Sequence, residues 1–411
     1  MTPAVAPTTP DPAVAPTTPD PAVAPTTPDP AGPAWLVPRA AYVHIPFCTH
    51  HCGYCDFAVV VGRDHQHALY LEALQAELAA LGPPRPVRSI FIGGGTPTVL
   101  SADHLAWLLD LLNRQFPHDG QAEVTIESTP DSLTAEKVAA LRAGGVNRVS
   151  IGVQSFAASA LRLLDRQHRS EQVPQVVAMV RQQIPAVSLD LIFGVPEQSL
   201  ADWQADLEAA LALEPVHLST YGLTYEKGTP LWKRRQRGQV RPIDEELELA
   251  QYVWAMDRLE AAGFVHYEIS NFARPGYESR HNHVYWANEA YFGVGLGAAR
   301  YVNGVREVNT RDFDRYVRCC LCGEPATFQR EQLDPEARAR ETITTQLRRA
   351  SGIDRTRFAE QTGFSFDQLA GPRYAHLLAA GLLHDDGQSV RLTRAGRCVA
   401  DSVALEFLAA S

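Results

Sequence analysis

The chain has 411 residues, of which 45% are apolar and 20% charged, the balance of a globular protein with a large core and two or three domains. Its formal net charge of −10 gives no electrostatic reason to expect nucleic acid as a partner, and no apolar run approaches the ~18–20 residues of a membrane span. Seven cysteines are too few for a disulfide scaffold and no secretory leader is recognised, so we expect reduced thiols in a cytoplasmic protein.

Residues 1–34 are dominated by proline, and the nonapeptide PAVAPTTPD occurs three times, at residues 3–11, 12–20 and 21–29. Because proline lacks a backbone N–H and fixes φ, such a segment cannot build helix or ladder hydrogen bonds. The sequence therefore predicts a disordered, extended tail, with a spacer or docking arm as the alternative interpretation.

Strands and helices alternate from residue 35 onward. Strands are predicted at residues 42–47, 89–92, 123–126, 148–153, 188–192 and 217–221. Helices are predicted at residues 68–81, 103–113, 134–143, 158–164, 173–182 and 200–210. Such a series of βα units predicts a parallel sheet, either open or curled into a barrel, with its chemistry at the carboxyl ends of the strands.

A basic stretch at residues 233–241 interrupts this pattern, and a helix predicted at 245–262 follows it. Asn, His and aromatic residues then gather, so we interpret residues 271–330 as a connecting region that helps to form the site. Over residues 331–411, helices predicted at 337–349, 355–362 and 366–379 and a hairpin at 382–392 indicate a winged-helix-like α+β module. Ten basic residues against eleven acidic ones argue against DNA binding by this module.

Three cysteines lie at positions i, i+4 and i+7 directly after the first predicted strand: Cys48, Cys52 and Cys55. Three soft thiolate ligands in a tight loop are able to hold three irons of a [4Fe–4S] cluster. Zinc is the alternative, with His50 or His51 as its fourth ligand. The same spacing describes a helix face of packed cysteines, but Pro46 and Gly53 argue against a helix here.

This CxxxCxxC motif, with the aromatic Tyr54 before its third cysteine, resembles the pattern of radical S-adenosylmethionine (SAM) proteins. The resemblance implies an α/β fold, a partial (βα)6 TIM-like barrel, over residues 35–270. It also implies that the cysteines bind three irons while the amino and carboxylate groups of SAM chelate the fourth. An electron from the cluster then cleaves SAM to methionine and a 5′-deoxyadenosyl radical. Three protein ligands leave one iron open for the cofactor, which four cysteines would not.

Further motifs at the ends of predicted strands extend the resemblance. It implies that a glycine-rich turn contacts the amino acid end of SAM, formed by Gly94, Gly95 and Thr96. It implies that four polar residues hold the ribose and carboxylate of SAM: Glu127, Gln154, Arg166 and Asp190. Tyr42 and Tyr54 would line the pocket near the cluster. Each polar residue alone is more often a cap or a surface group, but polar groups at successive strand ends converge on one cavity.

Nearly the whole chain after the tail resembles the coproporphyrinogen dehydrogenase (HemN) branch and, within it, the HemW-type haem chaperones. Dehydrogenases carry a further cysteine two residues after the third one, where this chain has Phe57. A HNxxYW motif resembles the signature of the HemW branch and contains four haem-contact candidates: His281, Asn282, Tyr285 and Trp286. His281 would ligate the iron, and the two aromatic residues would stack on the porphyrin. In the alternative interpretation, the motif binds a loop by hydrogen bonds and Trp286 plugs the barrel.

The resemblance implies a haem chaperone that binds a [4Fe–4S] cluster, SAM and haem and passes haem to an acceptor protein, with a dimer as one option for its assembly. The alternative is an oxygen-independent coproporphyrinogen III oxidase, a radical SAM oxidative decarboxylase, against which Phe57 and the HNxxYW motif count. A metal-dependent regulator is disfavoured by the charge of the C-terminal module. Cys319, Cys320 and Cys322 lie too close together on one predicted helix to face one metal, so we interpret them as incidental.

Overall fold

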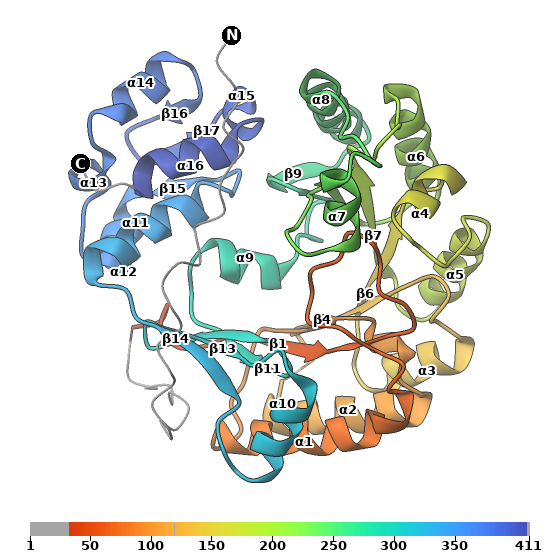
Figure 1. Ribbon diagram of the computed structural model, residues 1–411. Helices are drawn as coiled ribbons and strands as arrows, with labels where there is room; N and C mark the ends of the chain where they lie inside the picture. Colours follow the sequence, from red (N-terminus) through yellow and green to blue (C-terminus); the bar gives the residue numbers. More distant parts are fainter. Residues whose placement is uncertain (1–32, 119, 409–411) are drawn as a thin grey trace.

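A strongly curved sheet forms the centre of the computed structural model, which describes residues 33–118 and 120–408 (Figure 1). The tail predicted over residues 1–34 lies outside the described residues except for its last two. Nine strands follow one another across the sheet: β11 (Phe292–Val294), β1 (Ala40–Ile45), β4 (Ser89–Gly94), β5 (Glu123–Ser128), β6 (Arg148–Gln154), β7 (Ala186–Phe193), β8 (His217–Gly222), β10 (Asn271–Ala273) and β9 (Val265–Glu268). Neighbours from β11 to β8 pair in parallel, whereas β10 pairs antiparallel with β8 and β9. The parallel partial barrel predicted from the sequence is confirmed, and β9, β10 and β11 extend its edges.

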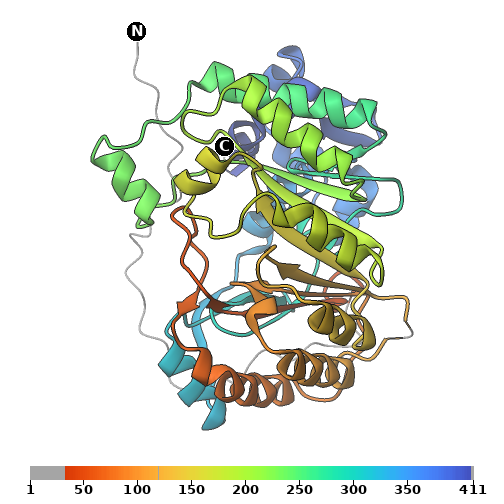
Figure 2. The ribbon, with the colours of Figure 1, turned by 90° about the vertical axis from the view of Figure 1, so that its right-hand side faces the viewer.

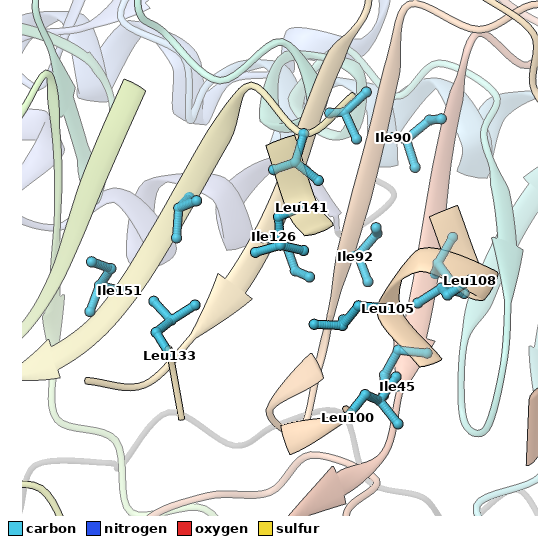
Figure 3. Packing of buried hydrophobic residues seen from close by; sticks show 14 of the residues in the cluster. Ile45, Ile90, Ile92, Leu100, Leu105, Leu108, Ile126, Leu133, Leu141 and Ile151 are labelled. Atoms are coloured by element: carbon cyan, nitrogen blue, oxygen red, sulfur yellow. The ribbon is translucent and has the colours of Figure 1, made fainter. Parts of the chain in front are cut away.

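Helices cover the outer face of this sheet (Figures 1 and 2). They are α1 (His67–Ala80), α2 (Ala102–Gln115), α3 (Ala135–Ala143), α4 (Ala158–Leu163), α5 (Gln172–Arg181), α6 (Leu200–Ala212) and α8 (Glu245–Ala261). Ile90 and Ile92 of β4 are buried in one cluster with Leu105 and Leu108 of α2 (Figure 3). This apolar layer between sheet and helices is the main core and holds the strands at fixed spacing.

The inner face of the barrel is polar, because successive strand residues point to opposite faces of a sheet. On β5, Val124 and Ile126 belong to the apolar core, so Thr125 and Glu127 between and after them face inward. A parallel strand buried on both faces usually reads as a continuous apolar run. These inward polar side chains therefore mark the barrel interior as a place for a site rather than a second apolar core.

Side-chain caps fix where several barrel helices begin. Ser101 Oγ accepts a hydrogen bond from the backbone N–H of His104 at 3.2 Å at the start of α2, and Ser199 and Asp202 form a capping box at the start of α6. Such caps satisfy N–H groups that have no partner within the helix. They thereby define the loops between strand ends and helices, which carry the predicted motifs.

Residues 271–330 contain more regular structure than the sequence predicts. After β10 come α9 (Arg280–Trp286), β11, β12 (Ala299–Val302), β13 (Val305–Asn309), α10 (Phe313–Leu321) and β14 (Thr327–Glu331). The buried carboxylate of Glu77 on α1 accepts hydrogen bonds from the Gly295 backbone N–H at 2.8 Å, Asn309 Nδ2 at 2.6 Å and the Tyr316 hydroxyl at 2.7 Å. This network fastens the region to the barrel. On α10, Cys319 and Cys320 are buried among apolar residues.

The C-terminal module has a core of its own, which includes Phe358, Phe366 and Phe407. Its elements are α11 (Pro335–Gln346), β15 (Ile353–Asp354), α12 (Arg355–Thr362), α13 (Phe366–Ala370), α14 (Arg373–Ala379), β16 (Leu383–Asp385), β17 (Ser389–Leu392), α15 (Arg394–Arg397) and α16 (Ala400–Leu408). The single helix predicted over residues 366–379 is wrong, because Gly371 has a φ of 63° and Pro372 follows it, which ends α13. Among the described residues, no helix is long and apolar enough to cross a bilayer.

Candidate functional site

A cavity of about 540 Å³ opens at the carboxyl ends of the barrel strands. Its wall contains most of the predicted cofactor residues: Cys48, Cys52, Tyr54, Cys55, Gly94, Gly95, Thr96, Glu127, Gln154, Arg166 and Asp190. Tyr42 is outside the wall, with its hydroxyl hydrogen-bonded to His44 Nδ1 at 2.9 Å and its ring stacked on Phe91. The fold therefore gathers residues from five strand ends around one space, as the sequence predicts.

The cysteines follow β1: Cys48 ends the short strand β2 (Phe47–Cys48), and Cys52 and Cys55 lie on the loop between β2 and β3 (Val60–Val61). The glycine-rich turn after β4 supports this loop, because the Gly95 N–H donates to the Ile45 carbonyl at 2.9 Å and the Thr96 N–H to the Phe47 carbonyl at 2.8 Å. A Cβ atom on Gly95 would lie 2.6 Å from the Phe47 carbonyl oxygen. Only glycine permits this close approach, which fixes the cysteine loop against the turn.

The cysteine thiols are half-buried and lie beside one cation. Burial raises the pKa of the Cys48 thiol to about 11 and also raises the pKa of Cys55. Arg166 Nη1 donates to Cys52 Sγ at 3.6 Å. Neutral thiols in such surroundings become thiolates when they coordinate a metal, because the charge of the metal removes their protons.

The donors on the cavity wall fit the cluster that the resemblance implies. A [4Fe–4S] cluster takes one thiolate per iron, so three cysteines leave one iron open for a further ligand. Zinc would need a fourth protein ligand, for which His50 and His51 line the same wall.

Gln154 and Arg166 offer polar groups to a ligand. Gln154 has a left-handed backbone φ of 65° where the pairing of β6 with β7 shifts register, a strain that is typical of functional sites. Arg166 Nη2 donates to the Gly152 carbonyl at 2.5 Å, but its buried Nε has no hydrogen-bond partner among the described residues. An unpaired guanidinium N–H in a cavity wall suits the carboxylate of a ligand.

Two buried carboxyl groups of the cavity wall, Glu127 and Asp190, lie close enough to influence each other's charge. Burial and the charge of Asp190 raise the pKa of Glu127 to about 8, although the Gly94 N–H donates to its carboxylate at 3.0 Å. Burial also raises the pKa of Asp190, which accepts hydrogen bonds from the hydroxyls of Ser150 at 3.0 Å and Ser219 at 2.7 Å. The motifs do not reveal these two serines; only their inward positions in the alternation of β6 and β8 could have indicated them.

The cavity wall is acidic overall. Its carboxylates are Asp56, Glu127, Asp131, Asp190 and Glu226, whereas Arg166 is its one Arg or Lys among the described residues. SAM carries a sulfonium, an ammonium and a carboxylate, so its net charge is positive. An acidic pocket of this size suits one such cationic molecule. The donor set therefore fits both groups that the resemblance implies.

The HNxxYW residues lie at the opposite end of the barrel, outside this cavity wall. His281 on α9 is 1% exposed, and its Nδ1 lies 3.2 Å from the hydroxyl of Ser89, the first residue of β4. Glu123, the first residue of β5, accepts a hydrogen bond from the His281 backbone N–H at 3.3 Å. Burial lowers the pKa of His281 to about 3. The motif thus starts at the amino ends of the strands.

The rest of the motif connects this end of the barrel to the C-terminal module (Figure 1). Asn282 Nδ2 donates to the Tyr267 hydroxyl at 3.4 Å, and the Tyr285 ring packs edge-on against His281 with centroids 4.7 Å apart. The guanidinium of Arg348 lies over the Trp286 ring, 4.9 Å from its centroid. The structure does not bring the four haem candidates to the cavity. His281 and Asn282 form hydrogen bonds, as in the alternative interpretation, but Trp286 packs against Arg348 of the C-terminal module and does not plug the barrel.

Comparisons with known proteins agree with this geometry. The family model described as "Radical SAM superfamily" matches residues 42–210, and the one described as "HemN C-terminal domain" matches residues 333–399. The solved structure of coproporphyrinogen III oxidase (HemN) from Escherichia coli superposes with a TM-score of 0.79 at 25% identity, covering 90% of each chain.

Curated relatives match over almost their full length. The protein named "Heme chaperone HemW" from Bacillus subtilis is 38% identical over 378 residues, which are 90% of this chain and 99% of that protein. The protein of the same name from Escherichia coli is 33% identical and covers 91% of this chain and 99% of its own length. "Radical S-adenosyl methionine domain-containing protein 1, mitochondrial" from Bos taurus is 34% identical over 90% of this chain and 87% of its own.

Proposed function

Because the chain belongs to the HemW-type haem chaperone family of the radical SAM superfamily, we propose that it is a haem chaperone that passes haem to an acceptor protein. In this proposal a [4Fe–4S] cluster and SAM occupy the acidic cavity, and haem is the cargo. The observation that carries the proposal is the meeting of three cysteines and the strand-end polar residues on one cavity wall. All seven cysteines are free, which supports a reducing compartment such as the cytoplasm.

Each wall residue has a role that follows from its chemistry. Cys48, Cys52 and Cys55 would hold the cluster, which together with SAM supplies one-electron cleavage of the sulfonium when both are bound. The unpaired Nε of Arg166 would donate to the SAM carboxylate. Asp190 would accept from ribose hydroxyls, and Glu127, with a pKa of about 8, would stay protonated at neutral pH and donate a hydrogen bond.

The second candidate is an oxygen-independent coproporphyrinogen III oxidase, the activity named for the Escherichia coli HemN structure that superposes on this chain. Phe57 stands against it. This side chain is 63% exposed and lies on the cavity wall, where the oxidase branch carries a further cysteine. A phenyl ring offers neither a metal ligand nor a proton to a substrate.

The test is an anaerobic haem titration of the reconstituted full chain, followed by the Soret absorption, beside an assay of coproporphyrinogen III consumption with SAM and a reductant. We expect saturation at a fixed haem stoichiometry and no consumption of the porphyrinogen. Consumption without saturable haem binding would overturn the proposal in favour of the oxidase.

A further inference from the structure

The segment 227–241 carries an unusual charge for this chain. It contains six basic residues and no acidic one, although the whole chain has a net charge of −10. The basic residues are Lys227, Lys233, Arg234, Arg235, Arg237 and Arg241. In the described structure, where nineteen ion pairs are found, none of these six side chains takes part in one. We name this stretch the basic segment.

Contacts within the fold account for only part of the charge of the basic segment. Lys233, Arg234 and Arg235 lie in the last turn of the helix α7 (Pro230–Gln236), where positive charges interact favourably with the helix dipole. Arg234 Nη1 donates to the Leu163 carbonyl at 3.5 Å, and Arg235 lies over the Tyr225 ring, 4.8 Å from its centroid, and remains exposed. Lys233 and Arg237 are four residues apart, where like charges repel across a helix turn. Exposed like charges with no ion-pair partner in the described structure indicate an anionic ligand.

The basic segment lies beside the mouth of the cavity. The Leu231 backbone N–H donates to the Gly53 carbonyl at 2.8 Å, within the cysteine loop, and Leu231 is buried in a cluster against Tyr54. Figure 2 shows α7 projecting next to this loop. The cavity wall includes two exposed aromatic side chains, Phe57 at 63% and Tyr221 at 42%. Flat apolar surface and unpaired cations therefore occur together at this mouth.

We propose that haem docks over the mouth of the cavity, with its propionates on the basic segment and its ring on Phe57 and Tyr221. This inference rests on the proposed function, because it assumes that haem is bound at all. Inside the cavity, the other acidic side chains, Asp56, Asp131, Asp190 and Glu226, would repel the two propionates, and a volume of about 540 Å³ suits one cofactor. The acidic interior thus selects cationic SAM, and the basic segment selects the anionic porphyrin.

The test compares two triple variants of the full, anaerobically reconstituted chain. K233E/R235E/R237E reverses three exposed charges of the basic segment, and R142E/R318E/R357E reverses three exposed arginines elsewhere, which also make no ion pair in the described structure. Both variants change the net charge equally. We expect haem affinity to fall by about tenfold or more in the first variant and to stay unchanged in the second. Phe57→Ala should weaken haem binding in the same titration.

Haem dimethyl ester, which lacks propionate charges, sharpens the test. It should bind the wild type and K233E/R235E/R237E equally, because the basic segment has no carboxylate to contact. If wild type binds haem and K233E/R235E/R237E binds it with the wild-type affinity, or if both triple variants lose affinity equally, the propionates do not dock on the basic segment and this inference is wrong. If wild type binds no haem, the proposed function fails instead, so the two failures are distinguishable.

Discussion

The two ends of the barrel interior differ although the same strands build both. At the carboxyl ends, the wall is open and holds thiols, a left-handed glutamine and a guanidinium with an unpaired Nε. At the amino ends, α9 covers the strands, and His281 and Asn282 contact neighbouring side chains. Figure 1 shows α9 between the curved sheet and the C-terminal module.

The difference shows which end of the barrel is free to bind a ligand and which end is occupied by contacts within the chain. Loops after parallel strands are free to vary, so ligand-binding groups gather there. At the amino ends, the first residue of each of three strands forms a hydrogen bond with the segment 277–281. These residues are Ser89, Glu123 and Arg148. Substitution of a cluster ligand at the carboxyl end should therefore lower cofactor content, whereas substitution of a packed residue at the amino end should lower stability and leave cofactor content unchanged.

The largest effect should follow from Cys55→Ala. Loss of one of three thiolates leaves the cluster without a ligand for one iron, so we expect loss of its iron, its sulfide and its broad visible absorption. Iron and sulfide analysis after anaerobic reconstitution measures this. Cys322→Ala, at an exposed cysteine beyond α10, is the control and should keep the full cluster. An unchanged cluster in Cys55→Ala would show that the ligand assignment is wrong.

His281→Ala should act on stability. Its ring fills buried space between Phe91 and Tyr285 and bonds to Ser89, so we expect a loss of about 2–3 kcal/mol in the free energy of unfolding. Urea denaturation measures this loss. Cluster content and haem affinity of the folded variant should stay at the wild-type values. A folded variant that loses haem binding would instead make His281 a haem contact.

Glu127→Gln should remove a pH dependence of the free energy of unfolding. The folded-state pKa of Glu127, about 8, exceeds the ordinary glutamate value of 4.5, so this group stabilises the fold below pH 4.5, and that contribution is lost as pH rises through 8. In the cluster-free protein, we expect the variant to gain stability over wild type as pH rises, by about 2 kcal/mol between pH 5 and 6.5. Thermal unfolding at several pH values checks this. A difference that does not change with pH would contradict the raised pKa.

Arg166→Lys should have the smallest effect of the four. Lysine keeps the charge but loses the planar set of donors that reaches Cys52, Gly152 and a ligand at once. We expect SAM to bind about tenfold more weakly while cluster content is retained. Calorimetric titration of the reconstituted variant measures the affinity. Wild-type affinity would mean that Arg166 does not contact SAM.

Local patterns in the sequence predict the carboxyl end well. Each predicted strand coincides with a real one, and Glu127, Gln154 and Asp190 reach one cavity because parallel strands end on the same side. The sequence does not predict which end of the barrel a later segment occupies. The HNxxYW motif resembles a set of haem ligands. The contact of His281 with Ser89, 192 residues away in sequence, nevertheless places the motif at the amino ends of the strands. Helix α7 is not predicted either, because this stretch is interpreted by its charge, although Thr229 and Pro230 are typical of a helix start.

The most direct test of the central claim is electron paramagnetic resonance of the reduced, reconstituted protein before and after addition of SAM. If the cysteines and the strand-end residues form one cofactor site, SAM should change the g values of the cluster signal, and Arg166→Lys should require more SAM for the same change. A cluster signal that does not respond to saturating SAM would contradict the account, because the cluster and the polar residues would then belong to separate sites.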